Sequence, residues 1–356
     1  MNSFPSTSGR ARWTWVVLFT LIVSPAAQAE VALKKAPGRD FNNNKARTLV
    51  FPNWFKPTFW ELNDDINEAV KAGKIGIMID ASEENCTYCI AFIERSLNDP
   101  VIQKRFRKNF DALGLEVIGD TRIHDVDGKT YSVKNFLHKY KAYVTPTLLF
   151  FGKDGKLLLK ITGYYSPEKF SQVLDYFESG QYKKQSWRDY YAERNDKGSA
   201  GIVYDAEIFQ MKPGNLARNK SAARRPLMVL FEKPGCNDCK RLHDKVLSAQ
   251  TTRNWIKRFD AVQVNAEDGR SMLVTPAGHE TTARAWAASL DIAYYPAFVF
   301  FDEAGNEVFR IDTYTRNVRL ENSMSLVLNK GYVNELQLQR WSHEQFVRKH
   351  SEQKDQ

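Results

Sequence analysis

The stretch Glu84-Asn85-Cys86-Thr87-Tyr88-Cys89 has a counterpart 150 residues later, Pro234-Gly235-Cys236-Asn237-Asp238-Cys239. Together the two stretches hold all four cysteines of the 356-residue chain, as two Cys-x-x-Cys pairs. A small disulfide-stapled protein would scatter its cysteines, whereas a chain of this length has room for about two domains with cores of their own. The arrangement therefore indicates cysteines that are kept for chemistry.

The same offset of 150 residues aligns more than the cysteines. Cys86 and Pro146 are 60 residues apart, and so are Cys236 and Pro296. An aromatic pair and a turn glycine also fall into register, Phe150, Phe151 and Gly155 with Phe300, Phe301 and Gly305. Chance is a poor explanation for so many coincidences at one offset, so the chain is interpreted as a duplication.

Each half is predicted to alternate strands and helices. In the first half we expect strands over residues 74–80, 115–119, 147–151 and 157–162 and helices over 62–72, 86–97, 101–110, 133–140 and 167–177. In the second half we expect strands over residues 227–232, 261–265, 297–301 and 308–312 and helices over 236–247, 251–259, 281–290 and 320–329. Residues 120–132 and 267–278 are expected to be polar insertions. The order predicts an α/β sandwich in each half.

The position of each cysteine pair predicts thiol chemistry. A cysteine in the first turn of a helix faces free backbone N–H groups and the positive end of the helix dipole, which favour the nucleophilic thiolate. Three residues later, the second cysteine lies on nearly the same face and can resolve a mixed disulfide. Cys86 and Cys236 are therefore the expected attacking thiols, and Cys89 and Cys239 the resolving ones.

Other interpretations of these residues stay open in the sequence. Half of many zinc sites is also a Cys-x-x-Cys pair, although further ligands are mostly absent here. His243 shares a helical face with Cys236 and Cys239, so it is either a ligand or a surface or packing residue. Asp238 lies beside Cys236, where its negative charge is expected to oppose the thiolate. A vestigial second site is a further alternative.

The motifs above resemble those of the thioredoxin superfamily over nearly the whole chain after its leader. The resemblance is carried by residues 84–89, Val144-Thr145-Pro146-Thr147-Leu148-Leu149-Phe150-Phe151, residues 233–240 and Tyr295-Pro296-Ala297-Phe298-Val299-Phe300-Phe301. It implies two tandem thioredoxin-like three-layer α/β/α domains. It also implies thiol–disulfide oxidoreductase activity with no cofactor and no metal, the redox groups being the disulfides Cys86–Cys89 and Cys236–Cys239.

The resemblance also assigns roles to residues beside the cysteines. In that family the proline is cis and the residue before it pairs with bound peptide, which implies a substrate-binding role for Thr145 with Pro146 and Tyr295 with Pro296. A buried aspartate six residues before the first cysteine assists proton transfer, and Asp80 matches it. The second half has Leu230 there instead. Asp80 as a solvated residue at a strand end is the alternative.

Two departures from the family pattern predict sites that are not equivalent. Thioredoxins have tryptophan before the first cysteine, where this chain has Asn85 and Gly235. They have Gly-Pro between the cysteines, where it has Thr87-Tyr88 and Asn237-Asp238. The first site, with Asp80, is expected to be the more complete catalyst.

The first 29 residues resemble a secretory signal peptide. Arg10 and Arg12 precede the apolar run 13–23, and Ala27-Gln28-Ala29 supplies a cleavage pattern ending at Ala29. The run is shorter than the ~20 residues of a membrane span, which argues against the alternative of an uncleaved anchor. We therefore expect a periplasmic protein without stable membrane insertion.

Charge gives no sign of a nucleic-acid partner. The net charge of +9 is dispersed along the chain, with no basic stripe and interleaved aromatics. The predicted organisation is a signal peptide 1–29, a polar leader 30–50, a first domain 51–182, a linker 183–225, a second domain 226–334 and a polar tail 335–356.

The predicted function is reduction or isomerisation of disulfides in exported proteins by dithiol–disulfide exchange, with a membrane thiol electron donor as a second partner. The alternative is a tandem module that binds copper, zinc or a partner through its thiols without turnover.

Overall fold

The computed structural model describes residues 48–195 and 201–354. The predicted signal peptide 1–29 lies outside the described residues, as does the predicted leader up to residue 47. The first half contains α1 (Leu62–Lys71), β1 (Gly76–Ser82), α2 (Thr87–Phe92), α3 (Pro100–Asn109), β2 (Phe110–Glu116), α4 (Val133–Lys139), β5 (Thr147–Gly152), β6 (Leu157–Thr162) and α5 (Pro167–Glu178). A π-helical turn, Ile93–Leu97, continues α2.

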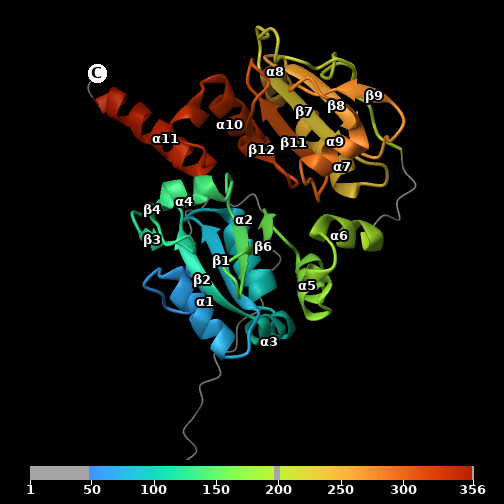
Figure 1. The fold of residues 1–356 in the computed structure, drawn as a ribbon. Coiled ribbons are helices and arrows are strands. Elements are labelled where there is room, and N and C mark those ends of the chain that lie inside the picture. Colours follow the sequence, from blue (N-terminus) through green and yellow to red (C-terminus); the bar gives the residue numbers. More distant parts are fainter. Residues whose placement is uncertain (1–47, 196–200, 355–356) are drawn as a thin grey trace, which may run out of the picture. The chain divides into compact units, whose positions relative to one another are not determined.

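The first half is built on a four-stranded sheet in the order β2-β1-β5-β6 (Figure 1). The central strand β1 runs parallel to β2 and antiparallel to β5, and all of its residues are buried. Its side chains alternate between two cores: Met78 packs with residues of α2, α3 and α5, and Ile77 and Ile79 pack with residues of α1 and α4. Both faces of the sheet are therefore covered, which confirms the predicted three-layer α/β/α domain.

The second half repeats this architecture. It contains β7 (Leu227–Glu232), α7 (Asn237–Leu242), α8 (Gln250–Ile256), β8 (Asp260–Asn265), α9 (Ala283–Ser289), β11 (Ala297–Phe301), β12 (Glu307–Ile311) and α10 (Asn317–Leu328). A π-helical turn, His243–Leu247, continues α7. The sheet order β12-β11-β7-β8 again puts the strand before the cysteines at the centre, with a core on each face. The predicted duplication thus extends to topology.

One predicted strand was misplaced. The strand expected at residues 115–119 is β2, which begins directly after α3 at Phe110 and ends at Glu116. Gly114, a residue of poor strand propensity, lies inside the strand. A Cβ there would meet the Phe51 ring at 2.5 Å, so the glycine makes room for an aromatic side chain.

The two predicted insertions contain short hairpins. The first holds β3 (Arg122–His124) and β4 (Thr130–Ser132), and the second β9 (Met272–Val274), after which β10 (Glu280–Thr282) leads into α9. Each pair of strands is antiparallel and three residues long. The polar composition concealed these strands because only alternate side chains, such as Ile123 and Leu273, are buried.

Residues predicted as linker and tail contribute to the cores. The helix α6 (Trp187–Asn195) buries Trp187 in the first-half core, and Ile208 and Phe209 join the second-half core. The C-terminal helix α11 (Leu338–Lys354) adds Leu338 and Trp341 to the second-half core. Among the helices of the described ranges, none combines the length and apolar character that crossing a membrane requires.

Candidate redox sites and the polar cluster of the second half

The first cysteine pair lies where the central strand passes into the following helix. Cys86 is the N-cap of α2 and is joined to Cys89 by a disulfide, with 5.3 Å between their Cα atoms. The backbone N–H of Cys89 donates to Cys86 Sγ at 3.1 Å. The sulfur that is expected to attack is therefore held against a free N–H of the helix end, the position that stabilises a thiolate.

The structure brings the predicted substrate-binding residues to this disulfide. The Thr145–Pro146 peptide bond is cis, which confirms the expectation from the resemblance. Thr145 is buried, and its hydroxyl donates to Cys86 Sγ at 3.4 Å. Residues 59 positions apart in sequence thus meet at the first sulfur.

Asp80 is fully buried in β1, which excludes the solvated alternative. Ser82 Oγ donates to its Oδ1 at 2.6 Å, while Oδ2 has no hydrogen-bond partner among the described residues. Burial raises the pKa of Asp80 to about 7, and the bond from Ser82 opposes this only in part. A carboxyl with this pKa can hold or release a proton near neutral pH.

Glu83 is a further acidic residue beside this site that the sequence analysis missed. Its Oε1 lies 3.5 Å from the Thr145 hydroxyl, whose single proton it shares with Cys86 Sγ, and burial raises the pKa of Glu83 to about 8. The signal was its place between a buried strand and the cysteines, where a charged side chain cannot remain fully solvated.

The second cysteine pair has the same local geometry. Cys236 is the N-cap of α7 and forms a disulfide with Cys239, with 5.2 Å between their Cα atoms. The N–H of Cys239 donates to Cys236 Sγ at 3.0 Å. The Tyr295–Pro296 bond is cis, as expected, and Tyr295 O lies 3.4 Å from Cys236 Sγ.

Three features distinguish the second site from the first. Cys236 is partly exposed, whereas Cys86 is only 6% exposed. Tyr295 takes the place of Thr145, so the sulfur faces a backbone carbonyl instead of a hydroxyl donor. Asp238 lies 3.5 Å from Arg241 one turn along the helix, an ion pair that moderates its effect on the nearby sulfur.

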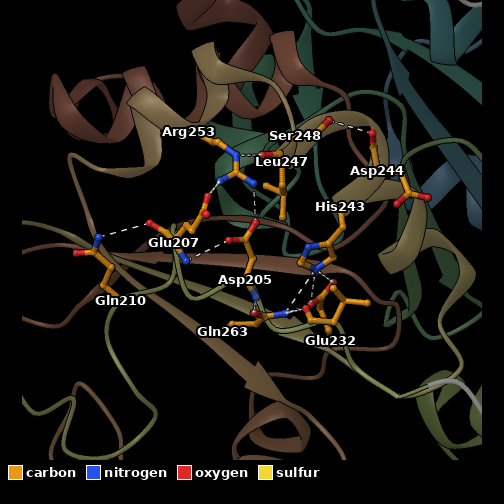
Figure 2. Close-up of polar contacts among 11 residues, drawn as sticks. Asp205, Glu207, Gln210, Glu232, His243, Asp244, Leu247, Ser248, Arg253 and Gln263 are labelled. Carbon is orange, nitrogen blue, oxygen red and sulfur yellow. Dashed lines mark hydrogen bonds and ion pairs between the residues drawn. The ribbon is translucent and has the colours of Figure 1, made fainter.

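A polar cluster of the buried Glu232 and Gln263 and the nearly buried His243 lies in the second half (Figure 2). His243 Nε2 is 3.1 and 3.2 Å from the two carboxylate oxygens of Glu232, and Gln263 Nε2 donates to the same carboxylate. The His243 side chain is 9% exposed, so it is a packing residue and not a surface one. In the described ranges, no group of three or more histidine, cysteine or acidic side chains is placed to hold a metal ion.

Sequence reasoning overlooked Glu232 and Gln263. A signal was present, because the 150-residue offset aligns Glu232 with Ser82, and a glutamate replacing serine inside a buried strand needs a partner. The partners could not be found without the register that pairs β7 with β8.

A family model described as a thioredoxin-like domain matches residues 62–178 and, a second time, residues 215–327. No curated protein sequence matches the chain.

Among solved structures, a thioredoxin-fold protein from Helicobacter pylori is 16% identical with a TM-score of 0.31, covering 39% of this chain and 92% of that protein. A thioredoxin from Thermus thermophilus is 22% identical with a TM-score of 0.25, covering 37% and 90%. A DsbH oxidoreductase is 14% identical with a TM-score of 0.24, covering 37% and 88%. At such identities and TM-scores, these likenesses say nothing about activity.

Proposed function

Because the chain belongs to the thioredoxin-like domain family, we propose that it is an exported thiol–disulfide oxidoreductase that reduces or isomerises disulfides of exported proteins. The proposal is carried by an arrangement of residues that occurs in both halves of the chain. A Cys-x-x-Cys pair caps the helix after the central strand, and a cis-proline peptide lies against the first cysteine. Such a duplicated arrangement serves exchange chemistry, since the sulfurs need no other group to transfer electrons.

The exchange begins from the reduced form of a site. The thiolate of Cys86 attacks one sulfur of a substrate disulfide, forms a mixed disulfide and releases the other sulfur as a thiolate. Cys89, once deprotonated, attacks Cys86 Sγ, forms the Cys86–Cys89 disulfide and releases the second substrate thiolate. Two electrons pass from the cysteine pair to the substrate, and an external dithiol, in the cell a membrane donor, restores the pair.

The neighbouring residues take distinct roles in this proposal. Asp80 accepts the proton of Cys89, because its pKa of about 7 and its buried, unpartnered Oδ2 suit a proton acceptor. The backbone at Thr145–Pro146 and at Tyr295–Pro296 pairs with an extended segment of the substrate.

Insulin reduction with dithiothreitol as the donor tests the exchange function. We expect the wild-type chain to accelerate insulin precipitation, Cys86→Ser and Cys236→Ser each to lose part of this activity, and the double variant to fall to the rate of dithiothreitol alone. A wild-type chain as inactive as the double variant would sink the proposal.

Export to the periplasm is tested separately. The mature protein recovered from a periplasmic fraction should begin at Glu30, immediately after the predicted cleavage at Ala29. Recovery of the chain with an intact N-terminus, in the cytoplasmic fraction only, would contradict export and leave the exchange chemistry untouched.

A further inference from the structure

Glu232 and His243 form a buried pair of ionisable groups that the exchange steps above leave unused. Glu232 is 1% exposed, and the His243 side chain 9%. Burying two such groups is costly unless they are paired and hydrogen-bonded, and replacing both with apolar side chains is often neutral or stabilising. Their retention in a core therefore calls for an explanation beyond stability.

The helix places this Glu–His pair next to the resolving cysteine. His243 follows Cys239 by four residues, and its backbone N–H donates to Cys239 O, so one regular turn of helix joins them. Side chains at this spacing lie on one face, with Cβ atoms about 5–6 Å apart. Cys239 is itself 6% exposed and cannot rely on bulk water to take its proton.

The first half has different residues at the positions that correspond to Glu232 and His243. There Asp80 and Ser82 lie on one face of β1, since residues two apart in a strand point the same way. The matching residues of β7 are Leu230 and Glu232. The buried carboxyl of the second half therefore lies two residues later in the strand than Asp80 does, on the same face of the sheet. On the helix, His243 stands where the first half has the apolar Ile93.

Gln263 is the third member of the polar cluster, and it also differs from the residue at the corresponding place in the first half. It is paired with Leu230 across the parallel strands β7 and β8, as Gly114 is paired with Asp80 in the first half. Its amide Nε2 donates to Glu232 and to Val203 O at 2.8 Å, and its Oε1 accepts from Asp205 N at 3.2 Å. Gln263 thereby holds the Glu232 carboxylate in the orientation that faces the His243 imidazole.

We propose that Glu232 and His243 together accept the proton of Cys239 when this thiol attacks the mixed disulfide at Cys236. The inference rests on the exchange function proposed above and assigns to the second half the role that Asp80 has in the first. The proton passes from Cys239 Sγ to the Glu–His pair, which holds it between carboxylate and Nε2. The Cys239 thiolate then forms the disulfide with Cys236, and the substrate leaves as a thiolate.

The charged groups around the pair are already engaged. Arg253 on α8 binds Asp205 and Glu207, each at 2.8 Å, in the segment that covers Gln263 (Figure 2). Asp244, next to His243, is half-exposed and bound to Lys240 at 2.6 Å. Of these groups, the Glu–His pair is the one that shares the helix face of Cys239, and the rate of resolution should follow its ionisation.

The test uses the full chain with Cys86→Ser and Cys89→Ser, so that only the second site reacts. Reduced protein is mixed with the aryl disulfide 5,5′-dithiobis(2-nitrobenzoate) by stopped flow. The first thiolate released reports attack by Cys236, and the second reports resolution by Cys239. Glu232→Gln and His243→Gln should slow the second release by tenfold or more and change its dependence on pH between 5 and 8, while the first release keeps its rate.

Glu280→Gln is the matched control, because it removes an exposed carboxylate of β10 in the same half; both of its phases should equal those of the parent. If the second thiolate is released at the same rate by the parent, Glu232→Gln and His243→Gln, the inference is overturned. The exchange function of the site would then still stand. A parent without a first phase would overturn the exchange function of this site, and the inference with it.

A measurement without any change to the pair guards against misfolded variants. The imidazole of His243 is titrated by NMR in the dithiol and disulfide forms of the same chain. If the pair exchanges a proton with Cys239, the two titrations should differ by about half a pH unit or more, since coupled groups shift each other. Superimposable titrations would contradict the inference.

Discussion

Asp80 combines full burial with a pKa near neutrality, and this has a consequence for stability. Its pKa rises from 3.8 to about 7 because the ionised carboxyl loses its hydration in the core. Between these values the folded chain holds a proton that the unfolded chain releases, so stability falls as pH rises through this window. Such a penalty is tolerated at functional sites and argues for a role of the carboxyl in chemistry.

Asp80→Asn is expected to remove this dependence on pH. The wild type should lose up to about 1.4 kcal/mol of unfolding free energy per pH unit between about pH 4 and pH 7, relative to the variant. Urea unfolding of the disulfide form at several pH values measures the difference. Asp64→Asn, a change to an exposed carboxylate of α1, serves as control and should leave the profile in place. Parallel profiles of wild type and Asp80→Asn would mean that Asp80 is ionised in the folded state.

At the scale of single elements, β2 contains a residue that local propensity would not place in a strand. Gly114 has poor strand propensity, yet the strand continues through it because the Phe51 ring fills the space of the missing side chain. Gly114 is the neighbour of Asp80 on the adjacent strand, so the Phe51 ring packs beside the strand position that holds the buried carboxyl.

Gly114→Ala should destabilise the first domain by about 1–3 kcal/mol, because the added methyl group overlaps the Phe51 ring. Gly119→Ala is the matched control: its Cβ would meet nothing closer than 3.4 Å, so it should cost far less. Thermal unfolding of the two variants and of Gly114→Ala with Phe51→Ala measures the effect. Truncating the ring should relieve much of the clash, and strictly additive losses would show that Phe51 is not its cause.

The whole molecule carries two disulfides in one fold with different surroundings. Cys86 receives a hydrogen bond from the Thr145 hydroxyl, and Cys236 faces the carbonyl of Tyr295 at the same place. A donor stabilises the thiolate of the reduced form, and a disulfide whose reduced form is stabilised is the stronger oxidant. We therefore expect the two disulfides of the duplicated fold to differ in redox potential.

We expect the Cys86–Cys89 potential to be less negative than that of Cys236–Cys239 by about 30 mV, which corresponds to a tenfold difference in the equilibrium constant. Equilibration with glutathione buffers, using chains that retain one cysteine pair each, measures both values. Thr145→Val should lower the potential of the first site toward the second, whereas Thr147→Val, whose hydroxyl bonds Val144 O, should not. Equal potentials, or a difference of opposite sign, would refute this assignment.

The sequence by itself determined the architecture and the location of the sulfurs. A fixed offset between repeats, the cysteine spacing and the prolines 60 residues later can be read in the sequence, and the two domains followed from them. Both cis bonds were expected from the family resemblance that these motifs carry. The order of the main strands and helices was likewise predicted from patterns in the sequence, but the short hairpins of the two insertions and the helices α6 and α11 were not. Around Gly114 the bounds of β2 were misplaced, because a contact with a distant side chain overrode local propensity.

Only the tertiary structure decided the environment of each site. The burial of Asp80, the placing of Thr145 on Cys86 and the joining of Glu232, His243 and Gln263 depend on strand register and helix packing. Glu232 meets His243 and Gln263 across 11 and 31 residues of chain. Hydration and charge at a buried atom are set by all elements that close around it, so residue types and spacing supply the groups, and packing determines their protonation.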